Sequence, residues 1–193
     1  MKAIGWLVSV LAALSVALGA GGALGAMSQK EKDKARAEIA KMERDTLAQL
    51  YRLQPGAKAT VEKAAGYAVF SNFGVKIFIA GSGSGKGVAV SSGSKKRVYM
   101  KMLEAQAGLG FGVKKFRLVW VFDNDKALND FIHSGWQIGG QASATAKKGA
   151  KGDAYTGAMS VGPGVWVYQM AGDGLALELT GKGTKYYKDD DLN

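Results

Sequence analysis

The chain contains no cysteine, a single histidine and two prolines among its 193 residues. Without cysteine it has no disulfide, no thiolate metal site, no thiol nucleophile and no cysteine for lipid attachment. His133 alone cannot form a zinc triad or a histidine cluster. No pair of carboxylates lies in an apolar stretch that would raise one pKa and create a general acid. The sequence therefore predicts a protein that is not an enzyme, with no catalytic residue, no metal site and no cofactor.

The first 26 residues have the composition of an export signal. A short basic start, Met1-Lys2, precedes an apolar run from Ile4 to Leu18 and then small residues over Gly19–Ala26. This order is typical of a secretory signal peptide with a small-residue cleavage site. The alternative is an uncleaved membrane anchor over residues 1–26, which are almost long enough to span a bilayer. We expect an exported protein, periplasmic or associated with the cell envelope.

Positive charge is unevenly distributed along the chain, whose net charge is +10. Residues 54–122 hold eleven Lys/Arg and two Glu, whereas residues 123–193 hold seven Lys/Arg and nine Asp/Glu. Such a local excess attracts polyanions, and each basic group near an anionic membrane contributes about 1 kcal/mol. The alternative is a solvated face that serves solubility, and nucleic acid is not expected as a partner of an exported protein. The candidate lipid-binding residues are Lys30, Lys34, Lys41, Lys86, Lys95, Lys96, Arg97, Lys114, Lys115 and Arg117.

The stretch AGSGSGKGVAV, residues 80–90, resembles a phosphate-binding loop only in part. A Walker A motif requires glycine where Ala80 stands and serine or threonine where Gly87 stands. Such a loop also opens into a helix, whereas Val88-Ala89-Val90 is a β-type run. We therefore interpret the glycines and serines as a flexible turn between two strands, without a nucleotide site.

Helical patterns occupy the N-terminal part and one later segment. Ser28 and Glu31 form a capping box that begins an amphipathic helix over residues 28–53. We expect its apolar face to pack against the domain, the alternative being a membrane interface. Further helices are predicted over residues 57–65 and, after a cap at Asp123 or Asn124, over residues 125–133.

Alternating patterns predict strands over residues 67–70, 73–80, 87–90, 97–102, 105–113, 116–122, 136–146, 154–160, 165–171 and 175–180. Short connections make consecutive strands antiparallel neighbours, and their glycines permit strong curvature. The predicted fold is α+β: N-terminal helices packed on a strongly curved, glycine-rich antiparallel sheet, with one helix inserted near residues 125–133. Residues 54–186 form the domain, residues 187–193 are expected to be a frayed polar tail, and Glu104 is expected to face solvent.

The order of several short motifs resembles the SYLF domain family. The segments that carry the resemblance are AAGYAVF at 64–70, GKG at 85–87, YMKM at 99–102, GLGFG at 108–112, VWVF at 119–122, KAL at 126–128, GWQIGG at 135–140 and the glycine-bounded stretch 172–181. The match covers about residues 45–185. It departs from the family at Ser71, where proline is usual, and over residues 73–80, which lack the usual glycines.

The resemblance implies a non-enzymatic, lipid-binding module, also described as an actin-binding domain in yeast actin-patch proteins. In some eukaryotic members a basic N-terminal helix contributes to lipid binding, and Lys30, Lys34 and Lys41 hold comparable positions. We expect binding to an anionic phospholipid membrane surface. The alternative is a protein-binding or structural component of the envelope, whose glycine-lined sheet face receives a protein partner.

Overall fold

The computed structural model describes residues 27–77, 80–107, 112–138, 155–176 and 184–193. Within these residues the chain forms three helices and one nine-stranded antiparallel sheet, so the predicted α+β class is confirmed. The predicted export signal, residues 1–26, lies outside the described residues. So do the GLGFG motif apart from its last glycine and most of the strands predicted over 136–146 and 175–180.

The N-terminal helix and the helix over residues 125–133 have their predicted bounds to within one residue, whereas the second helix ends at Lys63 rather than at residue 65. Helix α1 (Gln29–Leu53) starts at Ser28, whose side chain accepts a hydrogen bond from the Glu31 amide while the Glu31 carboxylate accepts one from the Ser28 amide. Helix α2 (Gly56–Lys63) follows Pro55, and α3 (Asp125–His133) is capped by Asn124. No helix in the described ranges is long and apolar enough to cross a bilayer.

Four long strands form the centre of the sheet, and five shorter ones extend it. The long ones are β1 (Gly66–Ile77), β2 (Ala80–Ser91), β3 (Arg97–Ala107) and β4 (Gly112–Phe122). The shorter ones are β5 (Trp136–Ile138), β6 (Met159–Gly162), β7 (Val165–Ala171), β8 (Gly174–Ala176) and β9 (Thr184–Lys188). The sheet order is β5-β9-β3-β2-β1-β4-β7-β6, with β8 paired to β7.

The glycine–serine stretch is a strand, and its interpretation as a flexible turn was wrong. Strand β2 pairs along its whole length with β1 and, from Ala80 to Val90, with β3. Its glycines provide space for neighbouring side chains. A Cβ on Gly87 would lie 2.3 Å from the Phe70 ring, and one on Gly85 would lie 2.9 Å from Cε of Met102. Glycine therefore marks a close approach of side chains here.

Other predictions about the sheet were also wrong: residues 67–70 and 73–77 belong to one strand, β1, and the strand predicted over 154–160 is β6, Met159–Gly162. Residues 105–113 do not form one strand, because Ala107 ends β3 and Gly112 begins β4. Strands β3 and β4 are consecutive but not neighbours, since β4 pairs with β1 and β7. The hydrophobic alternation over residues 105–113 gave no signal that these residues belong to two different strands, β3 and β4.

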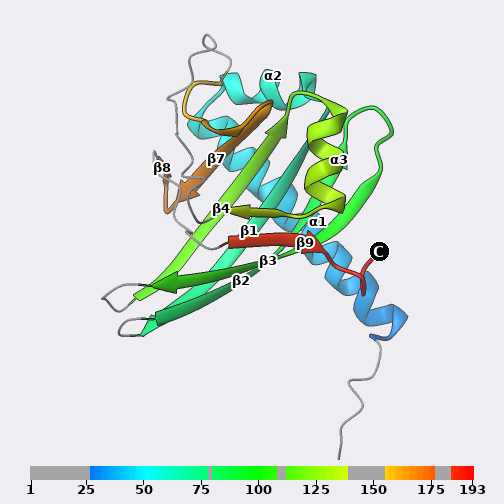
Figure 1. Cartoon of the computed structure of the whole chain (residues 1–193), viewed down its shortest axis with the longest axis vertical. Coiled ribbons are helices and arrows are strands. Elements are labelled where there is room, and N and C mark those ends of the chain that lie inside the picture. The colour runs from blue at the N-terminus through cyan, green and yellow to red at the C-terminus, as the bar shows by residue number, and fades with distance from the viewer. Residues whose placement is uncertain (1–26, 78–79, 108–111, 139–154, 177–183) are drawn as a thin grey trace, which may run out of the picture.

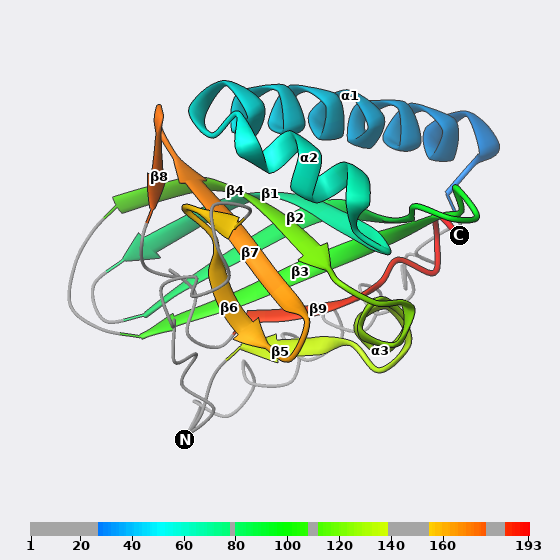
Figure 2. The same cartoon turned by 90° about the horizontal axis from the view of Figure 1, so that it is seen from above.

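The sheet curls into a half-barrel with helices on both sides (Figures 1 and 2). We call the side that carries α1 and α2 the outer face and the side that carries α3 the inner face. The two edges of the curl come together where Gly162 of β6 lies against the ring of Trp136 of β5. Leu128 and Phe131 of α3 fill the inner side together with Trp120 and Tyr186.

Helix α1 packs on the outer face through the residues that the helical period placed on one side. Ala35, Ile39, Thr46 and Leu50 are buried, and Leu50 is fully so. This confirms the packing interpretation of the apolar face and makes the membrane-interface alternative wrong, because the face is already covered by the sheet. Glu43 is buried with them, which the apolar pattern did not predict.

The C-terminal residues are docked rather than frayed. Thr184–Lys188 form strand β9, and Leu192 is 2% exposed between α1 and β2. The backbone carbonyl of Leu192 accepts hydrogen bonds from the guanidinium of Arg36. The side chain of Asn193 donates to the Tyr99 carbonyl at 2.8 Å. The polar composition of residues 189–191 concealed these contacts, and the frayed tail predicted there was wrong.

Candidate functional site

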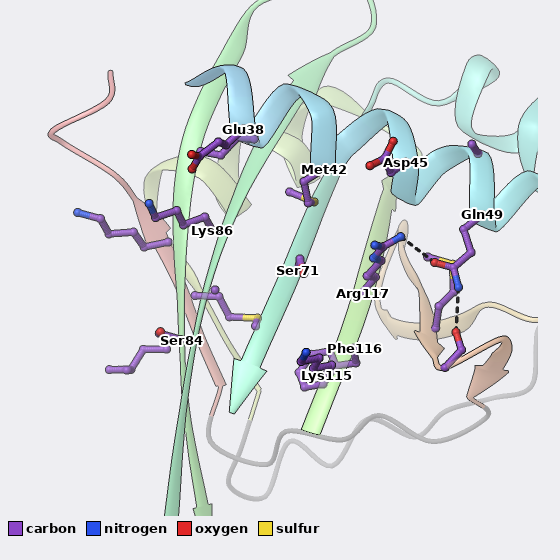
Figure 3. A pocket seen from close by; sticks show the side chains of 18 of the residues that line it. Glu38, Met42, Asp45, Gln49, Ser71, Ser84, Lys86, Lys115, Phe116 and Arg117 are labelled. Atoms are coloured by element: carbon purple, nitrogen blue, oxygen red, sulfur yellow. Dashed lines mark hydrogen bonds between the residues drawn. The ribbon is translucent and has the colours of Figure 1, made fainter. Parts of the chain in front are cut away.

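A groove of about 1240 Å³ lies between α1 and the outer face of the sheet. Figure 3 shows α1 along one side of the groove, with Glu38, Met42, Asp45 and Gln49 directed toward the strands. The opposite side is formed by β1, β2, β3 and β4, with contributions from β7 and β9. A second hollow, of about 450 Å³, lies beside α2 and is lined by Lys63, Asp123 and Tyr155 among others.

One row of side chains crosses six strands within the groove. The antiparallel register places Lys101 opposite Lys86, Lys86 opposite Ser71, and Ser71 opposite Arg117. Tyr187 and Met170 extend this row at its two ends. We call it the basic row: Tyr187, Lys101, Lys86, Ser71, Arg117 and Met170. Lys115 precedes Arg117 by two residues in β4 and therefore lies on the same face.

Arg117 is held in place by uncharged groups. Its guanidinium donates a hydrogen bond to Oε1 of Gln49 on α1 at 2.9 Å. The amide nitrogen of Gln49 in turn donates to the carbonyl of Gly172, also at 2.9 Å, and Figure 3 shows both bonds. These bonds orient the guanidinium, whose charge also acts on Asp45 of α1: Lys41 and, to a lesser extent, Arg117 lower the pKa of that carboxyl.

Lys101 differs from Arg117, because carboxylates of the C-terminal segment surround its ammonium. Its Nζ lies 2.8 Å from Asp189 and 3.0 Å from Asp191. The hydrogen bond to Asp189 raises the pKa of Lys101, and the contact with Asp191 raises it further. Like charges directly opposite each other on a sheet are destabilising, so this neutralisation makes the Lys86–Lys101 pair tolerable.

The groove also carries carboxylates on its α1 side. Asp45 forms an ion pair with Lys41 of the same helix, and the hydrogen bond from Lys41 lowers the pKa of Asp45. Glu38 and Asp173 are the other acidic residues that line the groove. The groove has a net positive charge, because its lining contains three carboxylates and five cations, Arg52, Lys86, Lys101, Lys115 and Arg117.

Exposed apolar side chains lie at one end of the basic row and next to it. Leu103 is 50% exposed and Tyr187 is 37% exposed, the two large hydrophobic side chains most open to solvent among the described residues. Leu103 lies two residues beyond Lys101 in β3, on the same face. Met42 of α1 is half-buried and lines the groove from the opposite side. The groove is therefore amphipathic as well as basic.

A separate charged cluster fixes α1 to the sheet beside the groove. The guanidinium of Arg97 donates to the buried carboxylate of Glu43, and the Tyr67 hydroxyl donates to the same group at 2.9 Å. Burial raises the pKa of Tyr67 above its usual value, and the Glu43 charge raises it further. Arg97 is thus part of the helix–sheet contact.

The structure brings three of the ten predicted lipid-binding residues into the groove: Lys86, Lys115 and Arg117. Lys30, Lys34 and Lys41 are exposed on α1, and Lys41 is paired with Asp45. Lys95 and Lys96 are exposed in the turn after β2. Arg97 is engaged with Glu43, and the side chain of Lys114 lies outside the described residues.

Sequence reasoning missed several residues of the groove. Lys101 and Ser71 were not candidates, although Lys101 lies in the YMKM motif of the family resemblance and Ser71 is the position where the family usually has proline.

Outside the groove, Glu104 was expected to face solvent but is 1% exposed, so that prediction was wrong. His133 ends α3 and is exposed. No group of three or more His, Asp or Glu side chains in the described ranges could hold a metal ion.

Comparison with known proteins gives two matches that overlap this site. Residues 103–193 match the Ysc84 family, described as Las17-binding protein actin regulator. Over 168 residues the chain is 33% identical to Beta cell expansion factor A of Aeromonas veronii. These residues are 86% of this chain, which spans 62% of the length of that relative.

The match to the Ysc84 family model covers slightly less than half of the chain. The SYLF resemblance is thereby confirmed, since the two names denote the same family. The matched region contains Lys115, Arg117 and Tyr187 of the groove but not α1, β1 or β2. These matches support a domain of the lipid- or actin-binding type.

Proposed function

We propose that this chain is an exported, non-enzymatic domain that attaches to anionic phospholipid headgroups at the cell envelope through the basic groove. The observation that carries the proposal is the convergence of Lys86, Lys115 and Arg117 on one face, beside exposed Leu103 and Tyr187. Residues 1–26 support the export part of the proposal, because their composition is that of a signal peptide.

The chemistry of the groove suits a membrane interface. Basic groups attract the negative surface of the bilayer, and each contributes about 1 kcal/mol close to it. The transfer of apolar and aromatic side chains at the border from water to the interfacial region is favourable. A groove that provides both kinds of group is better matched to a lipid surface than to a soluble polyanion.

Co-sedimentation of the purified full-length chain with vesicles tests this proposal. We expect binding to vesicles that contain phosphatidylglycerol and little binding to pure phosphatidylcholine. Binding should weaken strongly at high salt, because the screening length falls from about 10 Å at 0.1 M to about 3 Å at 1 M. Equal binding to both vesicles, or binding that ignores salt, would contradict the proposal.

A protein partner is the second candidate function, and the family description, Las17-binding protein actin regulator, favours it. Most of the glycine-lined face expected to receive such a partner, Gly108 and Gly110 with Gly112, lies outside the described residues, and the exposed large apolar side chains of the described residues are Leu103 and Tyr187. A partner would therefore use Leu103 and Tyr187 on the outer face. Capture of a stable protein from envelope extracts by wild type but not by Leu103→Asp, together with no vesicle binding, would favour this function over lipid attachment.

A further inference from the structure

The residues that follow β9 bring acidic side chains to one end of the basic row. Residues 189–193, which we call the C-terminal turn, lie beside the first part of α1 (Figures 1 and 2). The amides of Leu192 and Asn193 donate to the Asp189 carbonyl at 3.1 and 3.2 Å. The amide of Asp191 donates to the Asp189 carboxylate at 3.2 Å. These bonds fix the turn, so its carboxylates hold defined positions next to the groove.

Two anchors hold the C-terminal turn without the side chain of Asp191. Leu192 is 2% exposed in the apolar cluster beneath α1, and its carbonyl accepts two hydrogen bonds from the guanidinium of Arg36. The carboxamide of Asn193 accepts a hydrogen bond from the Tyr99 amide at 3.0 Å and donates one to the Tyr99 carbonyl at 2.8 Å. The Asp191 side chain can therefore change partner while the turn stays docked.

The ammonium of Lys101 has more negative than positive charge around it. Its Nζ lies 2.8 Å from Asp189 and 3.0 Å from Asp191. The hydrogen bond from Lys101 lowers the pKa of Asp191, and the charge of Lys32 on α1 lowers it further. Asp190 adds a third carboxylate, which forms no ion pair with any described residue. Three carboxylates are thus opposed by two cations, so an anionic group that approaches Lys101 meets net negative charge.

The two carboxylates that hold Lys101 differ in exposure. The side chain of Asp189 is 3% exposed, whereas that of Asp191 is 56% exposed and that of Lys101 is 34% exposed. An exposed ion pair is weak, because water screens its charges. Asp191 is therefore the partner that an anionic headgroup can displace, and Asp189 is the partner that remains.

We propose that Asp191 is an autoinhibitory contact of the groove, which keeps the ammonium of Lys101 from anionic headgroups until the headgroups displace it. The inference rests on the proposed function and adds its regulation. Tyr187 stands directly opposite Lys101 on β9, so release of Asp191 provides a cation beside an exposed aromatic ring. Displacement takes up part of the binding free energy, so the wild-type chain binds more weakly than the same groove without this carboxylate.

Co-sedimentation of the full-length chain with phosphatidylglycerol vesicles tests the inference. Asp191→Asn should bind about fivefold more tightly than wild type, the effect of one additional basic group at an anionic surface. The matched control Asp190→Asn makes the same charge change in the same turn at a carboxylate without an ion pair. Because salt screens this isolated charge, the control should stay within about twofold of wild type. Both side chains are exposed, so both variants should unfold at the wild-type urea concentration.

A double-mutant cycle with Lys101→Gln identifies the group that Asp191 controls. In the wild-type background Lys101→Gln should weaken vesicle binding by less than about twofold, because the ammonium is already engaged. In the Asp191→Asn background the same change should weaken binding about fivefold, because the ammonium then contacts the headgroups. Such non-additivity is the mark of a direct interaction. Binding is compared at a temperature where circular dichroism shows all four chains folded.

The outcomes separate this inference from the proposed function. Equal gains in Asp191→Asn and Asp190→Asn, or a gain that persists after Lys101→Gln, would overturn the autoinhibitory contact and leave membrane attachment standing. Vesicle binding by Asp191→Asn but not by wild type would support the contact in its strongest form. No binding of any of these chains to phosphatidylglycerol vesicles would overturn the proposed function, and the inference with it.

Discussion

The outer face of the sheet has two halves that lie on the same strands and differ in character. In the half nearest the start of β1, cross-strand rows carry apolar and aromatic side chains: Val90, Tyr67, Val121 and Trp166, then Tyr99, Val88, Val69, Val119 and Tyr168. The next row is the basic row, whose centre is Lys86, Ser71 and Arg117. The change occurs within two residues on each of the four long strands, β1 to β4.

The contrast shows what each half does. The first half contributes to packing with α1 and α2, and most of its side chains are buried. The second half is beneath the same helix and lines the groove, and Arg117 there contacts α1 directly through its hydrogen bond to Gln49. Charged side chains so close to a core weaken packing, so their presence on adjacent strands favours a role in binding. Changes in the first half should affect folding, and changes in the second should affect binding.

The largest expected effect is on folding, from Leu50→Ala on α1, where Leu50 packs against the apolar half of the sheet. Leu50 is fully buried between α1 and the sheet, and such truncations cost roughly 2–5 kcal/mol because they leave a cavity. Urea denaturation followed by circular dichroism measures the loss. Leu103→Ala is the matched control in the basic half and should change stability by less than about 0.5 kcal/mol. Equal losses in the two variants would contradict the comparison.

Removal of Arg97 tests the charged contact at the boundary between the halves. Arg97→Ala leaves the Glu43 carboxylate, which is 5% exposed, without its cationic partner. We expect a loss of roughly 1–3 kcal/mol in the free energy of unfolding, the usual cost of an unsatisfied buried group. Lys96→Ala, a change in the adjacent exposed turn, should have almost no effect. A stable Arg97→Ala variant with reduced vesicle binding would instead assign Arg97 to the lipid site.

A smaller effect is expected at the start of α1. Ser28→Ala removes one half of the capping box and should cost about 1 kcal/mol. Thermal unfolding monitored by circular dichroism is the measurement, with Ser94→Ala in the exposed turn as the control. Because Ser28 is remote from the groove, lipid binding at a temperature where both variants are folded should be unchanged.

The smallest expected effect is a dependence of stability on alkaline pH at the C-terminal contact. The pKa of Lys101 is raised in the folded protein, mainly by its hydrogen bond to Asp189. Its stabilising contribution is therefore complete below the unfolded value of about 10.4 and is lost as the pH rises through the folded value. Solvent screens this partly exposed pair, so the effect is modest. Urea midpoints should fall less steeply above about pH 10 in Lys101→Gln than in wild type, and parallel curves would contradict this.

The helices could be predicted from the sequence because their signals are local. The capping box at Ser28 and the asparagine cap before Asp125 each place a hydrogen-bond acceptor at a fixed distance along the chain. The glycine–serine strand could not be recognised in the same way. Its glycines are explained by the rings and side chains of other strands, which a linear pattern does not contain.

Only part of the candidate site could be predicted from the sequence, because strand pairing brings its residues together and a linear pattern does not contain that pairing. The sequence indicated a basic segment, and Lys86, Lys115 and Arg117 were among the expected residues. Adjacent lysines such as Lys95 and Lys96 also suggested a patch, but they lie in a turn away from the groove. The basic row is made by antiparallel register, which joins Lys86 and Arg117 across 31 positions of sequence through Ser71.

The most direct test of the central claim compares two charge reversals of equal size. Lys86→Glu with Lys115→Glu alters the groove, and Lys95→Glu with Lys96→Glu alters the exposed turn, so both double variants have the same net charge. The account predicts that binding to phosphatidylglycerol vesicles falls at least tenfold in the groove variant and remains within about twofold of wild type in the turn variant. Equal losses in the two variants would show that net charge alone attracts the protein to the membrane, and would contradict the claim that the groove is the binding site.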